Sequence, residues 1–167
     1  MFDHLFEGMA VDGEKTATYT WHDLPGEPKF HCKPAVEANK PYTAAALKLA
    51  NLKARKNQRK KNITTKDISN SRRDNAKLII AHCLTGWDDL QDTKGKKVDY
   101  SKDRAIEFFN AITNPAKVPP RIFQEFLDWI GDEANFTDDS EEEITIDDLD
   151  EIEEGDEDET LGKSSGD

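Results

Sequence analysis

The sequence predicts an α+β protein, with a small N-terminal β-hairpin, a mainly α-helical body and a disordered acidic C-terminal tail. Three patterns indicate this. Apolar and polar residues alternate before residue 35, apolar residues recur at helical spacing between 41 and 136, and acids dominate after 137. The expected divisions are 1–40 (leader and hairpin), 41–136 (helical body) and 137–167 (acidic tail).

The charge of this chain is divided unevenly along its length. The 167 residues carry a net charge of −12, with 35% hydrophobic and 35% charged residues. Residues 137–167 hold sixteen acids and one lysine, a net of −15, whereas residues 1–136 hold nineteen acids and twenty-two bases, a net of +3. Two cysteines give no disulfide framework, and no apolar run approaches the ~18 residues of a membrane helix. An intracellular protein is therefore expected.

The first predicted element is a hairpin that follows a mixed leader, Met1 to Gly13. From Lys15 to Trp21 the apolar residues alternate with threonines, as in a half-buried strand. Residues 24–28 have turn chemistry, and Lys29 to Lys33 is expected to return as a second strand. Because an isolated hairpin is marginally stable, it is expected to pack on the body.

The next predicted element is a basic helix that starts at Asn39-Lys40-Pro41. Its apolar stripe is Tyr42, Ala45, Leu49 and Leu52. Beyond this stripe come the bases Lys53, Arg55, Lys56, Arg59, Lys60 and Lys61. The helix is thus anchored at its start, and its far end is expected to project into water or onto a partner. Residues 62–71 are polar and are expected to form a joint.

Three apolar stripes between Asn75 and Phe136 predict the core. The first is Ala76, Ile79, Ile80, Cys83, Leu84 and Trp87, read as one helix that ends near Gly86. The second helix has Ser101 as its N-cap and stops before Pro115; the third opens at Pro119-Pro120. The expected core side chains surround Trp87 and include Tyr100, Phe108, Phe109, Phe123 and Phe126.

Metal and catalytic sites find little support in the sequence, so no catalytic residue, metal or cofactor is expected. The pairs His31-Cys32 and His82-Cys83 lack the loop spacing of zinc ligands, and Cys83 fits the apolar stripe. The acids between Asp88 and Asp99 lack the glycine and glutamate of a calcium loop. There is no phosphate-binding loop, GxSxG or HExxH motif.

Two segments are candidate partner-binding sites. The basic segment Lys53 to Arg73 is read either as a solvated helix face or as a contact for an acidic or amphipathic protein. Phosphate binding is the third interpretation, weakened by the lack of an aromatic residue for base stacking. The acidic tail is read either as a solubilising extension or as a partner-binding segment, or as a mask for the basic helix. Four aliphatic residues favour partner binding: Ile144, Ile146, Leu149 and Ile152.

Several short motifs resemble the tail assembly chaperones of tailed bacteriophages. They are Pro41-Tyr42 with its basic helix, Leu84-Thr85-Gly86-Trp87, Gly95, Val98-Asp99-Tyr100-Ser101, and then a helix, a proline break and a helix ending Asn135-Phe136. The resemblance spans residues 34–136. By resemblance Trp87 and Tyr100 mark a joint, although both are interpreted first as packing residues. The long acidic tail departs from the family pattern.

The resemblance implies a non-enzymatic chaperone that binds the tape measure protein and assists tail tube assembly in the host cytoplasm. Its expected partners are the tape measure and tail tube proteins, and self-association is also compatible. The alternative is a structural virion protein of the neck or tail, which mass spectrometry of purified particles would detect. A nucleic-acid-binding module that uses the basic helix is less favoured, and membrane association is not expected.

Overall fold

The computed structural model describes residues 1–58 and 62–137. Met1–Thr137 forms one compact unit, to which everything below refers. The expectations for Arg59, Lys60 and Lys61, and those for the acidic tail with Ile144, Ile146, Leu149 and Ile152, lie outside the described residues.

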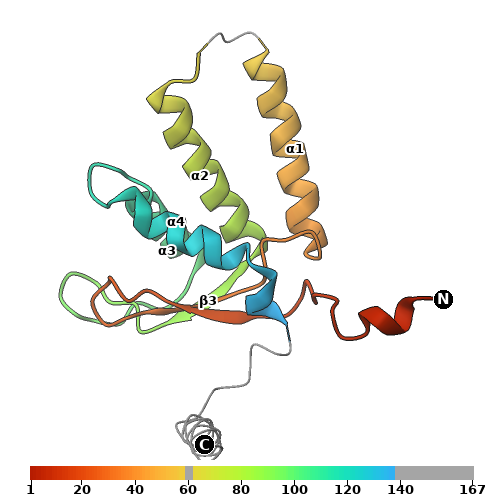
Figure 1. Cartoon of the computed structure of the whole chain (residues 1–167). Coiled ribbons are helices and arrows are strands. Elements are labelled where there is room, and N and C mark those ends of the chain that lie inside the picture. The colour runs from red at the N-terminus through yellow and green to blue at the C-terminus, as the bar shows by residue number, and fades with distance from the viewer. Residues whose placement is uncertain (59–61, 138–167) are drawn as a thin grey trace, which may run out of the picture. The chain divides into compact units, whose positions relative to one another are not determined.

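The described chain confirms the α+β class (Figure 1). The strands are β1 (Ala17–Thr20), β2 (Lys29–Cys32) and β3 (Leu84–Asp88). The helices are α1 (Lys40–Asn57), α2 (Thr65–His82), α3 (Lys102–Ile112) and α4 (Pro120–Ile130), with short 3₁₀ turns η1 (Asp3–Phe6) and η2 (Glu133–Phe136). Helices α3 and α4 lie against the sheet, whereas α1 and α2 rise side by side away from it.

The predicted hairpin is present, and it belongs to a three-stranded antiparallel sheet of order β1-β2-β3. Tyr19 pairs with Phe30, and Phe30 pairs in turn with Trp87. The prediction that one helix continues to Gly86 is wrong, because α2 ends at His82 and Trp87 lies on β3. The spacing of Leu84 and Trp87 suits either structure. The pairing with β2 decides between helix and strand. The backbone groups along the free edge of β2 need hydrogen-bond partners, and β3 supplies them.

The two C-terminal helices form where their start signals predict. The Ser101 hydroxyl accepts a hydrogen bond from the Arg104 amide at the start of α3, and α4 begins at Pro120. Each helix turns its apolar stripe toward the sheet. The buried stripe residues are Ala105, Phe109, Ile112, Ile122, Phe123, Phe126 and Ile130.

The centre of the core is formed by Phe126 and Trp21 rather than by Trp87, and Phe126 meets five aromatic rings. Trp21 is 2% exposed, and its ring meets four aromatic rings, those of Tyr19, Phe30, Phe108 and Phe126. Trp87 is also buried and stacks on Phe30, while its indole N–H donates to the Val98 carbonyl at 2.8 Å. The expectation that three helical faces close around Trp87 is therefore corrected: α2, α3 and α4 share the core with the residues of the three-stranded sheet.

Helix α2 begins at Thr65, eleven residues before Ala76, the first residue of the predicted stripe. The Thr64 hydroxyl accepts from the Asp67 amide, and the Asp67 carboxylate accepts from the Thr64 amide, which together form a capping box. The segment 62–71, predicted to be a joint, is thus largely the first turns of α2. The sequence interpretation missed this because the first turns carry few apolar residues, although the Thr-x-x-Asp signal was present.

Candidate functional site

The candidate site is the pair of helices α1 and α2, called here the arm. Its foot is fixed by Asn39, which is 2% exposed and caps α1. The Asn39 amide group donates to the Pro34 carbonyl at 2.9 Å and to the His82 carbonyl at the end of α2 at 3.1 Å. One buried side chain therefore joins the start of α1 to the end of α2.

The two helices differ in how far they are buried. Ala76, Ile79 and Ile80 of α2 are buried in the core, whereas no residue of α1 is buried. Only the foot of α1 reaches the core, where Tyr42 packs against it. Leu52, the last member of the predicted α1 stripe, is 48% exposed. The prediction that α1 is anchored at its start and projects beyond is consistent with this arrangement.

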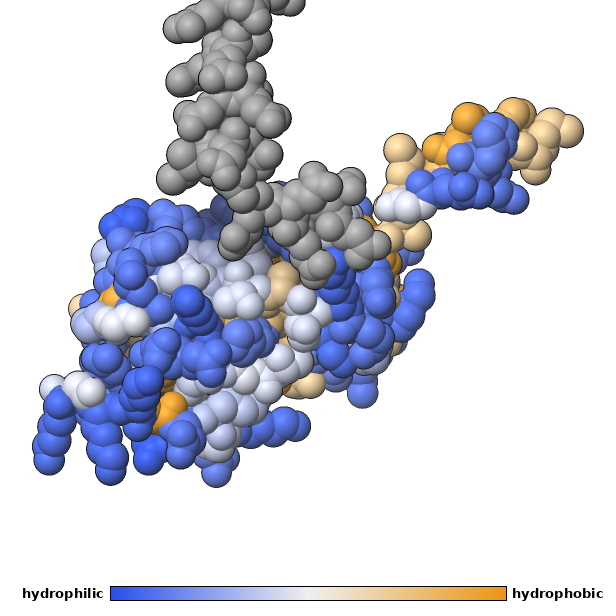
Figure 2. Space-filling model, turned by 90° about the horizontal axis from the view of Figure 1, so that it is seen from below, coloured by the Kyte–Doolittle hydropathy of each residue, from blue (hydrophilic) through white to orange (hydrophobic). Residues whose placement is uncertain are grey.

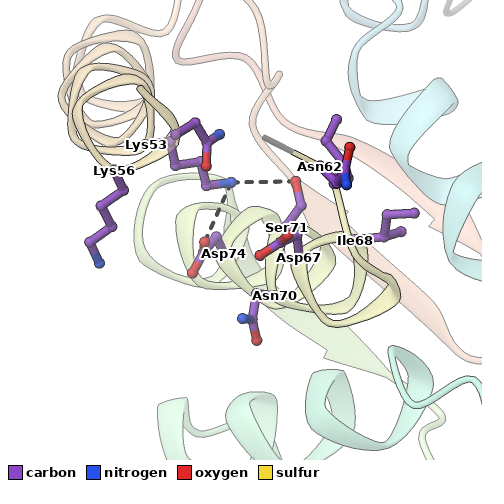
Figure 3. Close-up of a pocket in the computed structure, with 10 residues that line it drawn as sticks. Lys53, Lys56, Asn62, Asp67, Ile68, Asn70, Ser71 and Asp74 are labelled. Atoms are coloured by element: carbon purple, nitrogen blue, oxygen red, sulfur yellow. Dashed lines mark hydrogen bonds and ion pairs between the residues drawn. The ribbon is translucent and has the colours of Figure 1, made fainter. Parts of the chain in front are cut away.

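The arm concentrates positive charge. Residues 40–82 contain twelve bases and two acids, a net of +10, so the remainder of residues 1–136, with ten bases and seventeen acids, has a net of −7. Among the predicted binding residues, Arg55 and Lys56 are exposed on α1. Lys53 instead ties the helices together, since its ammonium lies 3.4 Å from the Asp74 carboxylate and 3.3 Å from the Ser71 hydroxyl (Figure 3).

A cleft of about 580 Å³ opens between the two helices toward their far end. Its walls come from both helices and from the chain just before α2: Lys53, Lys56, Asn57, Asn62, Ile63, Asp67, Ile68, Asn70, Ser71 and Asp74. Figure 3 shows Lys53 reaching from α1 to α2, with Ile68 and Asn62 beyond it. Ile63 and Ile68 are 84% and 49% exposed. The cleft thus offers apolar side chains beside amides and cationic groups.

The sequence interpretation singled out the bases of α1, and its basic segment Lys53 to Arg73 ran into α2 without assigning a helix there. The α2 wall of the cleft is Asp67, Ile68, Asn70, Ser71 and Asp74. Further bases of α2 lie outside this lining: Lys66, Arg72, Arg73 and Lys77. The Thr64–Asp67 capping signal was the clue that these bases lie on a helix. The local sequence does not show that α2 lies against α1. This packing depends on Asn39 and on the core contacts of Ile79 and Ile80.

Two cysteines and Asp92, which lie outside the arm, belong to the packing and the turns of the body. Burial raises the pKa of the Cys83 thiol to about 12 and raises that of Cys32 as well, so both thiols stay protonated at neutral pH. Asp92, in the segment considered for calcium, accepts from the amides of Lys94 and Lys96 in a turn. Within 1–58 and 62–137, no three His, Cys, Asp or Glu side chains are grouped as metal ligands would be.

Three tyrosines and one ion pair on the surface also have shifted pKa values. Burial is the main cause that raises the pKa of Tyr19, Tyr42 and Tyr100. A hydrogen-bonded pair on the surface lowers the pKa of Asp89 and raises that of Lys97. None of these groups lines the cleft. No helix in the described part of the chain is long and apolar enough to cross a bilayer.

Comparison with known proteins gives one match. A family model described as YdaY prophage protein matches residues 38–150. The match begins at the foot of α1 and covers the arm, β3, α3 and α4, and leaves β1 and β2 outside. No curated protein and no solved structure matches the chain.

Proposed function

The chain belongs to the YdaY prophage protein family, and on that premise we propose that it is a non-enzymatic chaperone of phage tail assembly. In this role it binds the tape measure protein and assists the assembly of tail tube subunits around it. The phage origin follows from family membership. The chaperone role goes beyond the phage origin. It is supported by the motifs around Trp87 and by the cleft and charge of the arm.

The observation that carries the proposal is the cleft between α1 and α2, which places exposed apolar side chains beside cationic ones. Long helical proteins expose apolar seams until they are assembled, and an amphipathic helix binds in an apolar groove between helices. Ile63 and Ile68 offer the apolar contact, while Lys56 suits acidic residues that flank such a seam.

A role without catalysis is supported by the state of the reactive groups. The two thiols are buried and protonated, and the acids of the cleft are already engaged: Asp67 in the capping box and Asp74 with Lys53. Catalytic acids and bases are usually recognised by a pKa perturbed toward neutrality in a cleft. Burial raises the pKa values of the Cys32 and Cys83 thiols away from neutrality instead.

Co-expression with the tape measure protein of the same prophage tests the proposal. We expect the two proteins to co-purify and the tape measure protein to stay soluble. Ile63→Glu with Ile68→Glu is expected to weaken binding about tenfold or more, because two apolar contacts are replaced by charge. Ile106→Glu is the matched control, since Ile106 is 47% exposed on α3, outside the cleft. Absence of binding by the wild-type chain would contradict the proposal.

Nucleic-acid binding is the second candidate, and the net charge of +10 on residues 40–82 favours it. Because residues 43–86 include no aromatic residue, such binding would rest on phosphate contacts and would fall steeply with salt. Gel mobility of duplex DNA and of RNA at several salt concentrations tests this. Lys56→Glu with Arg73→Glu should abolish the shift, whereas absence of any shift at low salt would exclude this candidate.

A further inference from the structure

The N-terminal leader, residues 1–10, presents apolar side chains that the described body leaves uncovered. Five large apolar residues are 56–99% exposed: Met1, Phe2, Leu5, Phe6 and Met9. The 3₁₀ turn η1 and the Met9 amide, which donates to the Phe6 carbonyl at 3.2 Å, give the leader local structure. Figure 2 shows this hydrophobic segment standing apart from the rest of the surface. A patch of this kind on a water-exposed segment is typical of a docking element.

The chain that follows the leader is held against the body. A Cβ at Gly13 would lie 2.0 Å from the Ala38 carbonyl oxygen, so the two backbones are in close contact at the foot of α1. Val11 packs against the core beside this contact. The leader therefore departs from a fixed point, and in Figure 1 it runs away from its own α1 rather than along it.

The outer face of α1, turned away from α2, is a second uncovered apolar surface. Leu47 and Leu52 are 63% and 48% exposed there. They line an open hollow of about 380 Å³ together with Ala44, Lys48, Asn51 and Arg55. This face is separate from the cleft between the helices.

The two surfaces are complementary in charge. The leader carries two acids, Asp3 and Glu7, beside its apolar residues, and the hollow carries two bases, Lys48 and Arg55. Lys48 and Arg55 are seven residues apart and therefore lie on one face of α1. Asp3 opens η1, and Glu7 follows its last residue. The acids of the leader can therefore meet the bases of the hollow while the phenylalanines cover the leucines.

We propose that the leader of one copy binds the outer face of α1 in a second copy, and that the exchange is reciprocal. The result is a symmetric dimer with two identical leader–helix contacts. Each leader contributes Phe2 and Phe6, both 61% exposed, and Leu5, 56% exposed. These side chains and the exposed Leu47 and Leu52 are buried twice in a reciprocal dimer, which adds toward the ~1,000 Å² that a specific interface requires. This dimer does not depend on the proposed chaperone role.

Light scattering coupled to gel filtration of the full chain at about 100 µM tests the proposal, with a dimer expected. Leu47→Ser with Leu52→Ser should give a monomer, as should Phe2→Ser with Phe6→Ser. Ile106→Ser is the matched control, since it removes an equally exposed aliphatic side chain from α3 and should leave the dimer intact. Circular dichroism checks that each variant remains folded.

A charge exchange identifies the contact itself. One variant carries Asp3→Lys with Glu7→Lys, and the other carries Lys48→Glu with Arg55→Glu. Each variant alone should be monomeric, because like charges face each other in both of its contacts. An equimolar mixture should restore the dimer, because both contacts are then of opposite charge. A monomeric wild-type chain, a dimer formed by either variant alone, or a mixture that stays monomeric would overturn the proposal.

Discussion

The arm and the sheet-based body treat their apolar and charged side chains in opposite ways. In the body, rings from β1, β2, α3 and α4 meet in one aromatic core, and Phe30 and Phe126 are wholly buried. In the arm, an 18-residue helix buries no side chain, and the charge is strongly positive. The body therefore provides stability, whereas the arm, held mainly at its foot, leaves its surface available for binding. The predictions below test this division.

The largest difference should come from truncating one apolar residue in each region. Phe126→Ala removes a fully buried ring and should lower the free energy of unfolding by about 3–5 kcal/mol. Ile68→Ala, at a position 49% exposed on α2, should change it by about 0.5 kcal/mol or less. Urea titrations followed by tryptophan fluorescence measure both. Similar losses for the two variants would contradict the division.

Alkaline pH should weaken the body through its thiols. Folding raises the pKa of Cys83 from 9.0 to about 12, so the protonated form is favoured in the folded state. Stability from this group is therefore complete below pH 9.0 and is lost as pH rises, by about 2–3 kcal/mol at pH 11. Urea titrations between pH 8 and pH 11 measure the slope, which should be shallower for Cys83→Ala. An equal slope in that variant would assign the effect to other groups.

A methyl group at Gly13 should loosen the junction between the leader and the body. Gly13→Ala places its Cβ 2.0 Å from the Ala38 carbonyl oxygen, so the backbone at one of these positions must shift. We expect a loss of about 1–3 kcal/mol, as for other overpacked sites. Gly86→Ala is the matched control, because nothing lies within 4 Å of its added Cβ. Thermal unfolding of both variants makes the comparison.

Loss of the Asn39 side chain should release the foot of the arm. Asn39→Ala removes the α1 cap and the hydrogen bonds to Pro34 and His82, at an expected cost of about 1–2 kcal/mol. Hydrogen exchange should rise in the first turn of α1 and the last turn of α2, and remain unchanged in α4. Ser101→Ala, which removes the cap of α3, should raise exchange in α3 instead. Uniform exchange throughout the chain would argue against a local role.

The smallest effect should come from the ion pair within the arm. Lys53 and Asp74 are 34% and 28% exposed, and solvent screens such a pair. A double-mutant cycle with Lys53→Met and Asp74→Asn should give a coupling free energy of about 0.5 kcal/mol, which falls with added salt. A coupling several times larger would mean that the two helices are held together along their length, and not mainly at the foot.

Much of the fold could be predicted because several elements carry local signals. Ser101 and Pro119-Pro120 mark the starts of α3 and α4, and alternation marks β1 and β2. β3 could not be predicted because Leu84 and Trp87 also fit a helical stripe, and only the edge of β2 decides between the two. For the arm, the bases of α1 could be named from sequence. The cleft could not, because it depends on which helix lies beside α1.

The register of the sheet has a consequence for how this protein is divided into fragments. The residues matched to the family begin at 38, yet β3 within them takes its hydrogen bonds from β2, which precedes that point. A shortened chain that starts at the match would lose β1 and β2. The backbone groups of β3 that pair with β2 would then be exposed, as would the rings that Phe30 and Trp21 now cover. Such an edge recruits other strands. The two short strands before the matched segment thus protect it against aggregation.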